Sequence, residues 1–169
     1  NDDLGKFWRV IQFLASSNYI FEGGDYKFVY EKKIKRIYSE GDSWKKEDIS
    51  FSEPKELIYL NTSRIFSFYR ERVLKEGEKP LPESTIQSYL KNTKAFICDT
   101  KKVYFNRVDP KTGIQELDEN KKKKYTSTSA FVFDYSLLPL SIRNETKNEG
   151  TIETENITTT DEPQQKLPF

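Results

Sequence analysis

Four polar side chains share one side of the segment from Pro82 to Asn92, which the sequence predicts to be a helix. At about 100° per residue, the opposite side carries Ile86, Tyr89 and Leu90, so one side can pack while the other faces outward. Hydroxyl and amide groups can reach base edges in a major groove and a lysine can meet a phosphate, which is the chemistry of a recognition helix. The solvated face of an ordinary amphipathic helix has the same pattern, and both interpretations remain open. The four residues are Ser84, Gln87, Ser88 and Lys91.

A second group of cations surrounds the segment between Val108 and Tyr125, which we expect to be a long hairpin loop, or wing. From Arg64 to Lys124 there are 15 basic and 9 acidic residues, a net charge of +6. A basic wing beside a polar helix could clamp phosphates and position a duplex without reading its sequence. A solubilising loop is the alternative, because three acidic residues just upstream of the lysine run dilute its charge. The cations are Lys101, Lys102, Arg107, Lys111, Lys121, Lys122, Lys123 and Lys124.

The residue inventory argues against catalysis. The chain has no His, which removes the commonest general base and the imidazole metal ligand. Its one Cys, Cys98, can form neither a disulfide nor a zinc cluster, and the apolar run around it predicts a buried structural thiol. The pair Gly23-Gly24 lacks the Gly-Lys that would complete a phosphate-binding loop. We therefore expect a protein that is not an enzyme and that has no cofactor and no metal.

The elements that would position these residues follow from periodicity and from turn signals. Their order predicts an α+β fold built on a winged helix-turn-helix, with or without a second small α+β module at the N-terminus. The expected segments are a helix from Asp2 or Asp3 to Ser16, a strand at 26–30 continuing over 32–38, an exposed polar loop at 39–48, an apolar run at 56–60, helices at 63–75 and 82–92, and strands at 94–98, 101–108 and 126–135.

Composition divides the chain into three expected parts. Residues 1–55 form a helix-plus-hairpin module, residues 56–142 the winged helix and residues 143–169 a disordered acidic tail. The tail holds 3 basic and 6 acidic residues and one aromatic, which is too little apolar surface to offset its ordering entropy. Residues 1–142 carry 25 basic and 21 acidic residues, a net of +4. The terminal Leu167-Pro168-Phe169 resembles the C-terminal peptides of bacterial single-stranded-DNA-binding proteins, which implies docking on a partner, although a plain tail is the alternative.

The cellular location of the protein is inferred from the sequence signals that it lacks. No apolar run approaches the roughly 18 residues of a membrane-spanning helix, and the start has no signal-peptide pattern. A single unpaired thiol favours a reducing compartment, so we expect a cytoplasmic protein without membrane contact. Because the sequence begins with Asn1 and contains no Met, we expect a piece of a longer chain.

One pattern extends over five segments of the sequence: Glu56–Asn61, Arg64–Arg70, Pro80–Leu90, Lys102–Val108 and Thr128–Tyr135. Together these segments resemble the C-terminal winged-helix region of primase-type helicases from phages and mobile elements. The resemblance implies a DNA-binding accessory domain for DNA replication, acting on duplex or forked DNA, with an upstream ATPase domain in the same chain. It transfers no catalytic residue. The alternatives are a winged-helix module for protein–protein interaction and a transcriptional regulator.

Overall fold

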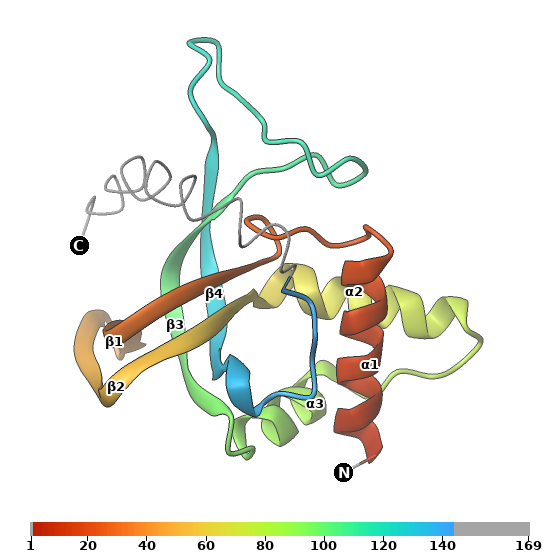
Figure 1. Ribbon diagram of the computed structural model, residues 1–169, viewed down its shortest axis with the longest axis horizontal. Coiled ribbons are helices and arrows are strands. Elements are labelled where there is room, and N and C mark those ends of the chain that lie inside the picture. Colours follow the sequence, from red (N-terminus) through yellow and green to blue (C-terminus); the bar gives the residue numbers. More distant parts are fainter. Residues whose placement is uncertain (1, 144–169) are drawn as a thin grey trace.

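Three helices pack against one face of a four-stranded antiparallel sheet in the computed structural model, which describes residues 2–143 (Figure 1). The strand order is β1-β2-β4-β3, and the predicted α+β class is confirmed. The elements in chain order are α1 (Asp2–Ser16), β1 (Tyr26–Glu40), β2 (Ser43–Asn61), α2 (Thr62–Lys75), α3 (Glu83–Lys91), β3 (Phe96–Asn106), β4 (Tyr125–Asp134) and a short 3-10 helix, η1 (Tyr135–Leu137).

An aromatic core lies between the helices and the sheet. The Phe7 ring of α1 is 5.6 Å from the Phe66 ring and 5.0 Å from the Tyr69 ring of α2, while Trp8 meets Phe133 of β4 edge-on at 5.3 Å. Side chains alternate along β4, so Phe131 and Phe133 share this face. The expected domain boundary at residue 55 falls inside β2, and residues on both sides of it contribute to this core.

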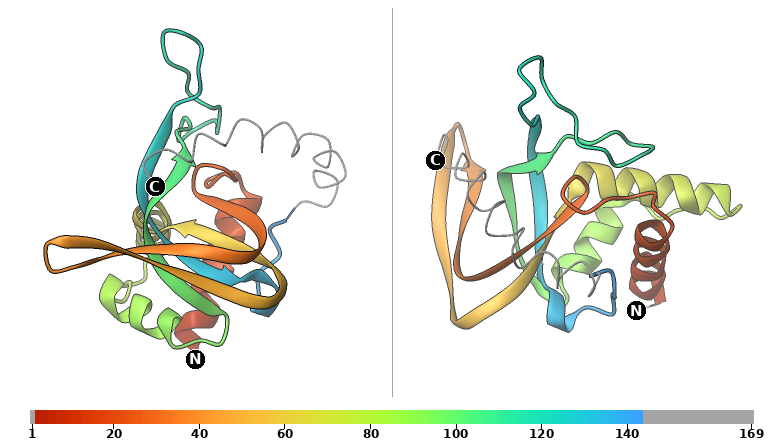
Figure 2. Two further views of the ribbon diagram at one scale, coloured as in Figure 1. Left: turned by 90° about the vertical axis from the view of Figure 1, so that its left-hand side faces the viewer. Right: turned by 45° about the horizontal axis from the view of Figure 1, so that its top comes forward.

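The opposite face of the sheet is covered by the hairpin of β1 and β2, which folds back across β3 (Figure 2). Glu31 pairs with Lys55 but Lys33 pairs with Ser50, so the ribbon bends where residues 51–54 of β2 interrupt the register. Beyond the bend, Ile37 donates its backbone N–H to Thr100 Oγ1 at 2.9 Å. A second apolar cluster lies beneath the hairpin: Ile34, Leu57, Tyr59, Cys98, Val103, Phe105, Ala130 and Val132.

The predicted polar loop at 39–48 is wrong, because this segment consists of strand on both sides of a two-residue turn. Glu40 pairs with Ser43 across Gly41 and Asp42, and Gly41 has a φ of 62°, which glycine adopts without steric cost. Both faces of this outer ribbon carry exposed polar residues, so the sequence lacks the apolar alternation that marks a half-buried strand. The strands expected at 94–98 and 101–108 are likewise one strand, β3, with an irregular register between Thr100 and Val103.

Two further expectations concern residues at the chain's end. The acidic tail after Arg143 and the docking peptide Leu167-Pro168-Phe169 lie outside the described residues. Among residues 2–143, no helix is long and apolar enough to cross a membrane.

Candidate nucleic-acid interface

The loop between β3 and β4, residues 107–124, is given its shape by hydrogen bonds within itself. The backbone N–H of Arg107 donates to Lys124 O at 2.9 Å, and that of Glu116 donates to Arg107 O at 2.8 Å. The Gln115 side chain reinforces this frame, because its Nε2 lies 2.8–3.1 Å from the carbonyl oxygens of Arg107, Glu116 and Lys124. The lysines are therefore presented on an ordered base.

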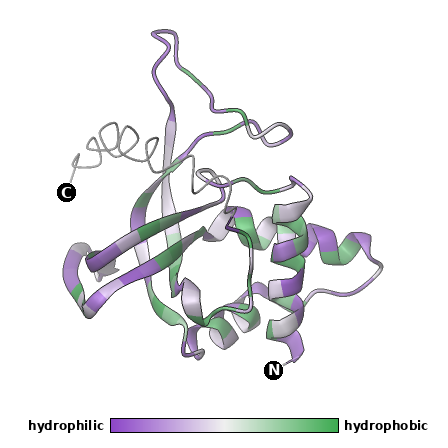
Figure 3. Ribbon diagram, in the orientation of Figure 1, coloured by the Kyte–Doolittle hydropathy of each residue, from purple (hydrophilic) through white to green (hydrophobic). Residues whose placement is uncertain are grey.

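The tip of this loop, residues 118–124, exposes a run of lysines. The Asp118 carboxylate accepts the backbone N–H groups of Asn120 and Lys122 at 2.8 and 2.9 Å, so one of the acids that dilutes the charge also stabilises the turn. Within residues 2–143, no ion pair involves the side chains of Lys121, Lys122 or Lys124. Figure 3 shows a hydrophilic tip that projects away from the sheet. Lys121, Lys122 and Lys123 are exposed at this tip, and Lys124 is partly buried.

A second lobe of the loop, residues 109–113, lies apart from the tip and carries Lys111 (Figure 1). The Asp109 carboxylate accepts the backbone N–H groups of Lys111 and Thr112, and these hydrogen bonds hold the pKa of Asp109 below its usual value. Gly113, with a φ of 74°, lies against the Phe21 ring, where an added Cβ would come within 2.4 Å of a ring carbon. Residues 109–113 therefore form a turn of their own, and Lys111 is not part of the lysine tip.

Helix α3 has a buried side and an exposed polar side, as predicted. Ile86 and Leu90 are buried, whereas Ser84, Ser88 and Lys91 are exposed. The Lys91 ammonium lies 4.0 Å from the Asp99 carboxylate of β3. Half-buried Gln87 donates to the carboxylate of Glu83 at 3.0 Å, a bond it would have to exchange to reach a base edge. Binding by this face stays a prediction.

The structure does not bring the polar face of α3 and the lysine tip into one patch. The C-terminal end of α3 leads into β3, and the loop begins where β3 ends, so the two sets lie toward opposite ends of the β3–β4 hairpin (Figure 1). Arg107 remains at the base of the loop, where its Nε donates to Thr126 Oγ1 at 3.3 Å.

Lys101 and Lys102 lie between these two sets, at the irregular step of β3. Lys102 has a φ of 56°, an uncommon conformation for a residue other than glycine. Its ammonium lies 4.3 Å from the centroid of the Trp44 ring, which belongs to the β1–β2 hairpin. Sequence reasoning missed Trp44 because it assigned residues 39–48 to a loop. The signal that could have revealed it is a tryptophan, a strong strand former, two residues after the turn signal Gly41-Asp42.

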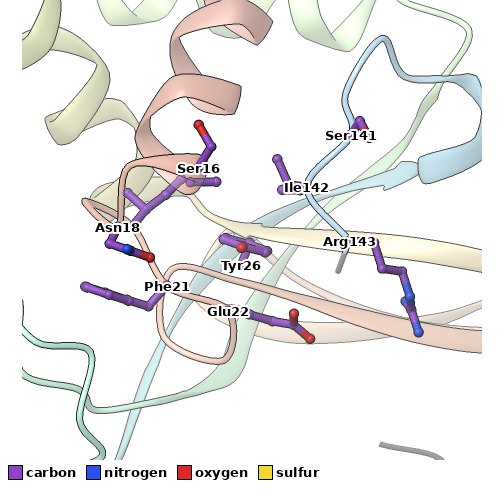
Figure 4. A pocket seen from close by; sticks show the side chains of 10 residues that line it. Ser16, Asn18, Phe21, Glu22, Tyr26, Ser141, Ile142 and Arg143 are labelled. Carbon is purple, nitrogen blue, oxygen red and sulfur yellow. The ribbon is translucent and has the colours of Figure 1, made fainter. Parts of the chain in front are cut away.

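A cavity of about 440 Å³ lies between the end of α1, the segment at 20–22 and residues 141–143 (Figure 4). Its charged side chains are those of Glu22 and Arg143, and Arg143 also forms an ion pair with Glu56 at 2.8 Å. Burial raises the pKa of the Tyr26 phenol at its wall. Among residues 2–143, no group of three or more acidic or cysteine side chains is arranged to hold a metal ion.

Cys98 is buried in the second apolar cluster, as predicted. Burial raises the pKa of its thiol from the ordinary 9.0 to about 12. Above pH 9.0 the unfolded thiol loses its proton while the native thiol keeps it. The free energy of unfolding therefore falls as the pH rises above 9.0.

We expect Cys98 to react with a disulfide reagent at pH 8 at least about 100-fold more slowly in the native protein than in the unfolded one, because only the thiolate attacks. The native rate should keep rising above pH 9, whereas the unfolded rate levels off. Stopped-flow absorbance in buffer and in denaturant measures both rates. Equal rates would show that the thiol is accessible and ionised.

Comparisons of the chain with models of protein families, with curated proteins and with solved structures find no match.

Proposed function

We propose that this chain is a non-catalytic DNA-binding accessory domain of a cytoplasmic replication protein of the primase or helicase type. The observation that carries the proposal is the loop at 107–124, which holds four successive lysines on an ordered frame, three of them without an ion-pair partner among the described residues. Ammonium groups presented in this way suit the phosphates of a DNA backbone. Contacts of this kind position DNA without specifying its sequence.

The order of elements supports a winged-helix version of this function. If β1 is set aside, the chain runs through a helix (α1), a strand (β2), two helices (α2 and α3) and a hairpin (β3 and β4). Strand β2 pairs with β4. In that arrangement α3 is the recognition helix and the loop at 107–124 is the wing. Strand β1 is an addition at the edge of β2. The resemblance to the terminal region of primase-type helicases implies that an ATPase domain precedes this one.

The proposal is tested by changing all four lysines, Lys121–Lys124, to alanine. We expect the affinity for a duplex of about 20 base pairs, two helical turns, to fall at least about tenfold at low salt, largely independently of sequence. The slope of log K against log salt should shrink by about 2–4, since each lost phosphate contact removes about 0.9. Fluorescence anisotropy over a salt series measures both quantities.

The matched control removes the same charge elsewhere. Lys32, Lys33, Lys75 and Lys79 are exposed and lie outside the loop and α3, so changing them to alanine lowers the net charge equally. This variant should keep most of the affinity. If both quadruple variants lose affinity equally, net charge rather than the loop determines binding.

Two exposed aliphatic side chains favour a second candidate, a module for protein–protein interaction. Ile114 and Leu117 are 67% and 52% exposed on the same loop. Undetectable DNA binding at low salt together with stable self-association in sedimentation would favour this alternative. A transcriptional regulator would instead discriminate among duplex sequences through α3, and substituting Gln87 would change that preference.

A further inference from the structure

The tip of the β1–β2 hairpin, residues 38–46, presents an aromatic ring to solvent. Trp44 lies opposite Ser39, two residues after the Gly41–Asp42 turn, and 52% of its surface is exposed. The other tryptophan, Trp8, is buried in the core at 4% exposure. Packing beneath the hairpin therefore does not account for Trp44, since about half of its surface stays in water.

Strand β3 supplies a cation to this ring. The shift in register between Thr100 and Val103 and the left-handed backbone of Lys102 direct its side chain toward the hairpin. The ammonium then lies 4.3 Å from the ring centroid, within the range of a cation–π contact. An uncommon backbone conformation that brings a cation to an exposed ring is a feature typical of binding sites.

The charges around the ring suit an anionic ligand. Lys46 follows Trp44 by two residues and shares its side of the ribbon. Two further exposed lysines are Lys45, next to Trp44 in the chain, and Lys101, next to Lys102. Two carboxylates, Glu40 and Asp42, flank the turn, so cations outnumber acids four to two over residues 38–46 with 101 and 102.

We infer that the hairpin tip binds an unpaired nucleic-acid strand, with one base stacked on Trp44 and an adjacent phosphate beside Lys102. Base faces inside a duplex are covered by the neighbouring base pairs, whereas both faces of an unpaired base are open to an exposed aromatic ring. This inference rests on the proposed function and refines it. A DNA fork offers a duplex for the lysine loop and a single strand for the hairpin tip.

The test uses the intact chain and a thymidine oligonucleotide of about 16 nucleotides, the upper range for a stacking site. We expect the oligonucleotide to quench tryptophan fluorescence in the natural chain but not in Trp44→Phe, where only buried Trp8 emits. Trp44→Ala should weaken oligonucleotide binding about tenfold while changing duplex binding less than about twofold, and Trp44→Phe should restore most of the loss.

Tyr30→Ala is the matched control. Tyr30 is 68% exposed on the same hairpin, but among residues 2–143 no cation lies over its ring. Its replacement should leave oligonucleotide binding unchanged. Circular dichroism verifies that all variants fold.

The outcomes separate the two proposals. Oligonucleotide binding that Trp44→Ala leaves intact, or that Tyr30→Ala weakens equally, overturns the stacking site even if the duplex still binds through Lys121–Lys124. Absence of binding to both duplex and oligonucleotide overturns the proposed function together with the stacking site. Quenching that Trp44→Phe abolishes, with a selective loss of oligonucleotide affinity in Trp44→Ala, supports the stacking site.

Discussion

Replacing Phe133 with alanine is expected to lower the free energy of unfolding by about 3–5 kcal/mol. The Phe133 side chain is fully buried, and its ring lies 5.3 Å from that of Trp8 and 5.6 Å from that of Phe96. Truncation removes the transfer free energy of the ring and leaves a cavity that rigid aromatic neighbours cannot refill. Since domains of this kind are stable by only about 5–15 kcal/mol, the variant should be marginal at 37 °C.

Urea denaturation followed by circular dichroism measures this loss. The control is Leu137→Ala, because Leu137 is exposed on η1 and its truncation should cost less than about 0.5 kcal/mol. A loss below about 1 kcal/mol for Phe133→Ala would mean that the helices do not pack on β4 as described.

The second large effect is expected at the ion pair of Asp25 and Arg64. Asp25 is fully buried, and its carboxylate accepts from Arg64 Nε at 2.9 Å and from the Phe21 backbone N–H at 2.8 Å. Arg64→Ala leaves a buried negative charge without its cation. We expect a loss of about 3 kcal/mol, the lower end for a buried pair, because the arginine side chain is itself partly exposed.

A double-mutant cycle with Asp25→Ala tests this assignment. Once the carboxylate is gone, removing Arg64 should cost much less, so the double variant should lose less stability than the sum of the single variants. Additive losses would show that Arg64 contributes through its contact with the Phe68 ring, 4.9 Å away, rather than through Asp25. The same urea denaturation assay measures all three variants.

Local patterns in the sequence were sufficient to predict the helices. The apolar spacing in α1 and α2 and the division of α3 into packed and polar sides follow from residues within one or two turns of each other. The alternation of Phe131 and Phe133 in β4 and the Asp109–Gly113 turn are local in the same sense. Each needs no information about distant segments.

The outer half of the β1–β2 hairpin could not be predicted in this way. Residues 39–48 of this hairpin are exposed and, apart from Gly41 and Trp44, polar, so the interactions that stabilise the pairing there are backbone hydrogen bonds, which are available to any residue except proline. The ion pair of Arg36 with Asp99 at 2.9 Å, which joins this hairpin to β3, connects residues far apart in the chain. No pattern within either segment indicates the other.

The sequence by itself determined which segments pack and where cations accumulate, because periodicity and composition are local properties. Only the tertiary structure decided which polar groups meet. It places the lysine loop and the polar face of α3 toward opposite ends of one hairpin, and it brings Trp44 to Lys102. The first result follows from the length of β3, which separates α3 from the loop, and the second depends on the bend at residues 51–54 and on the irregular step in β3, where long-range pairing sets the direction of the chain.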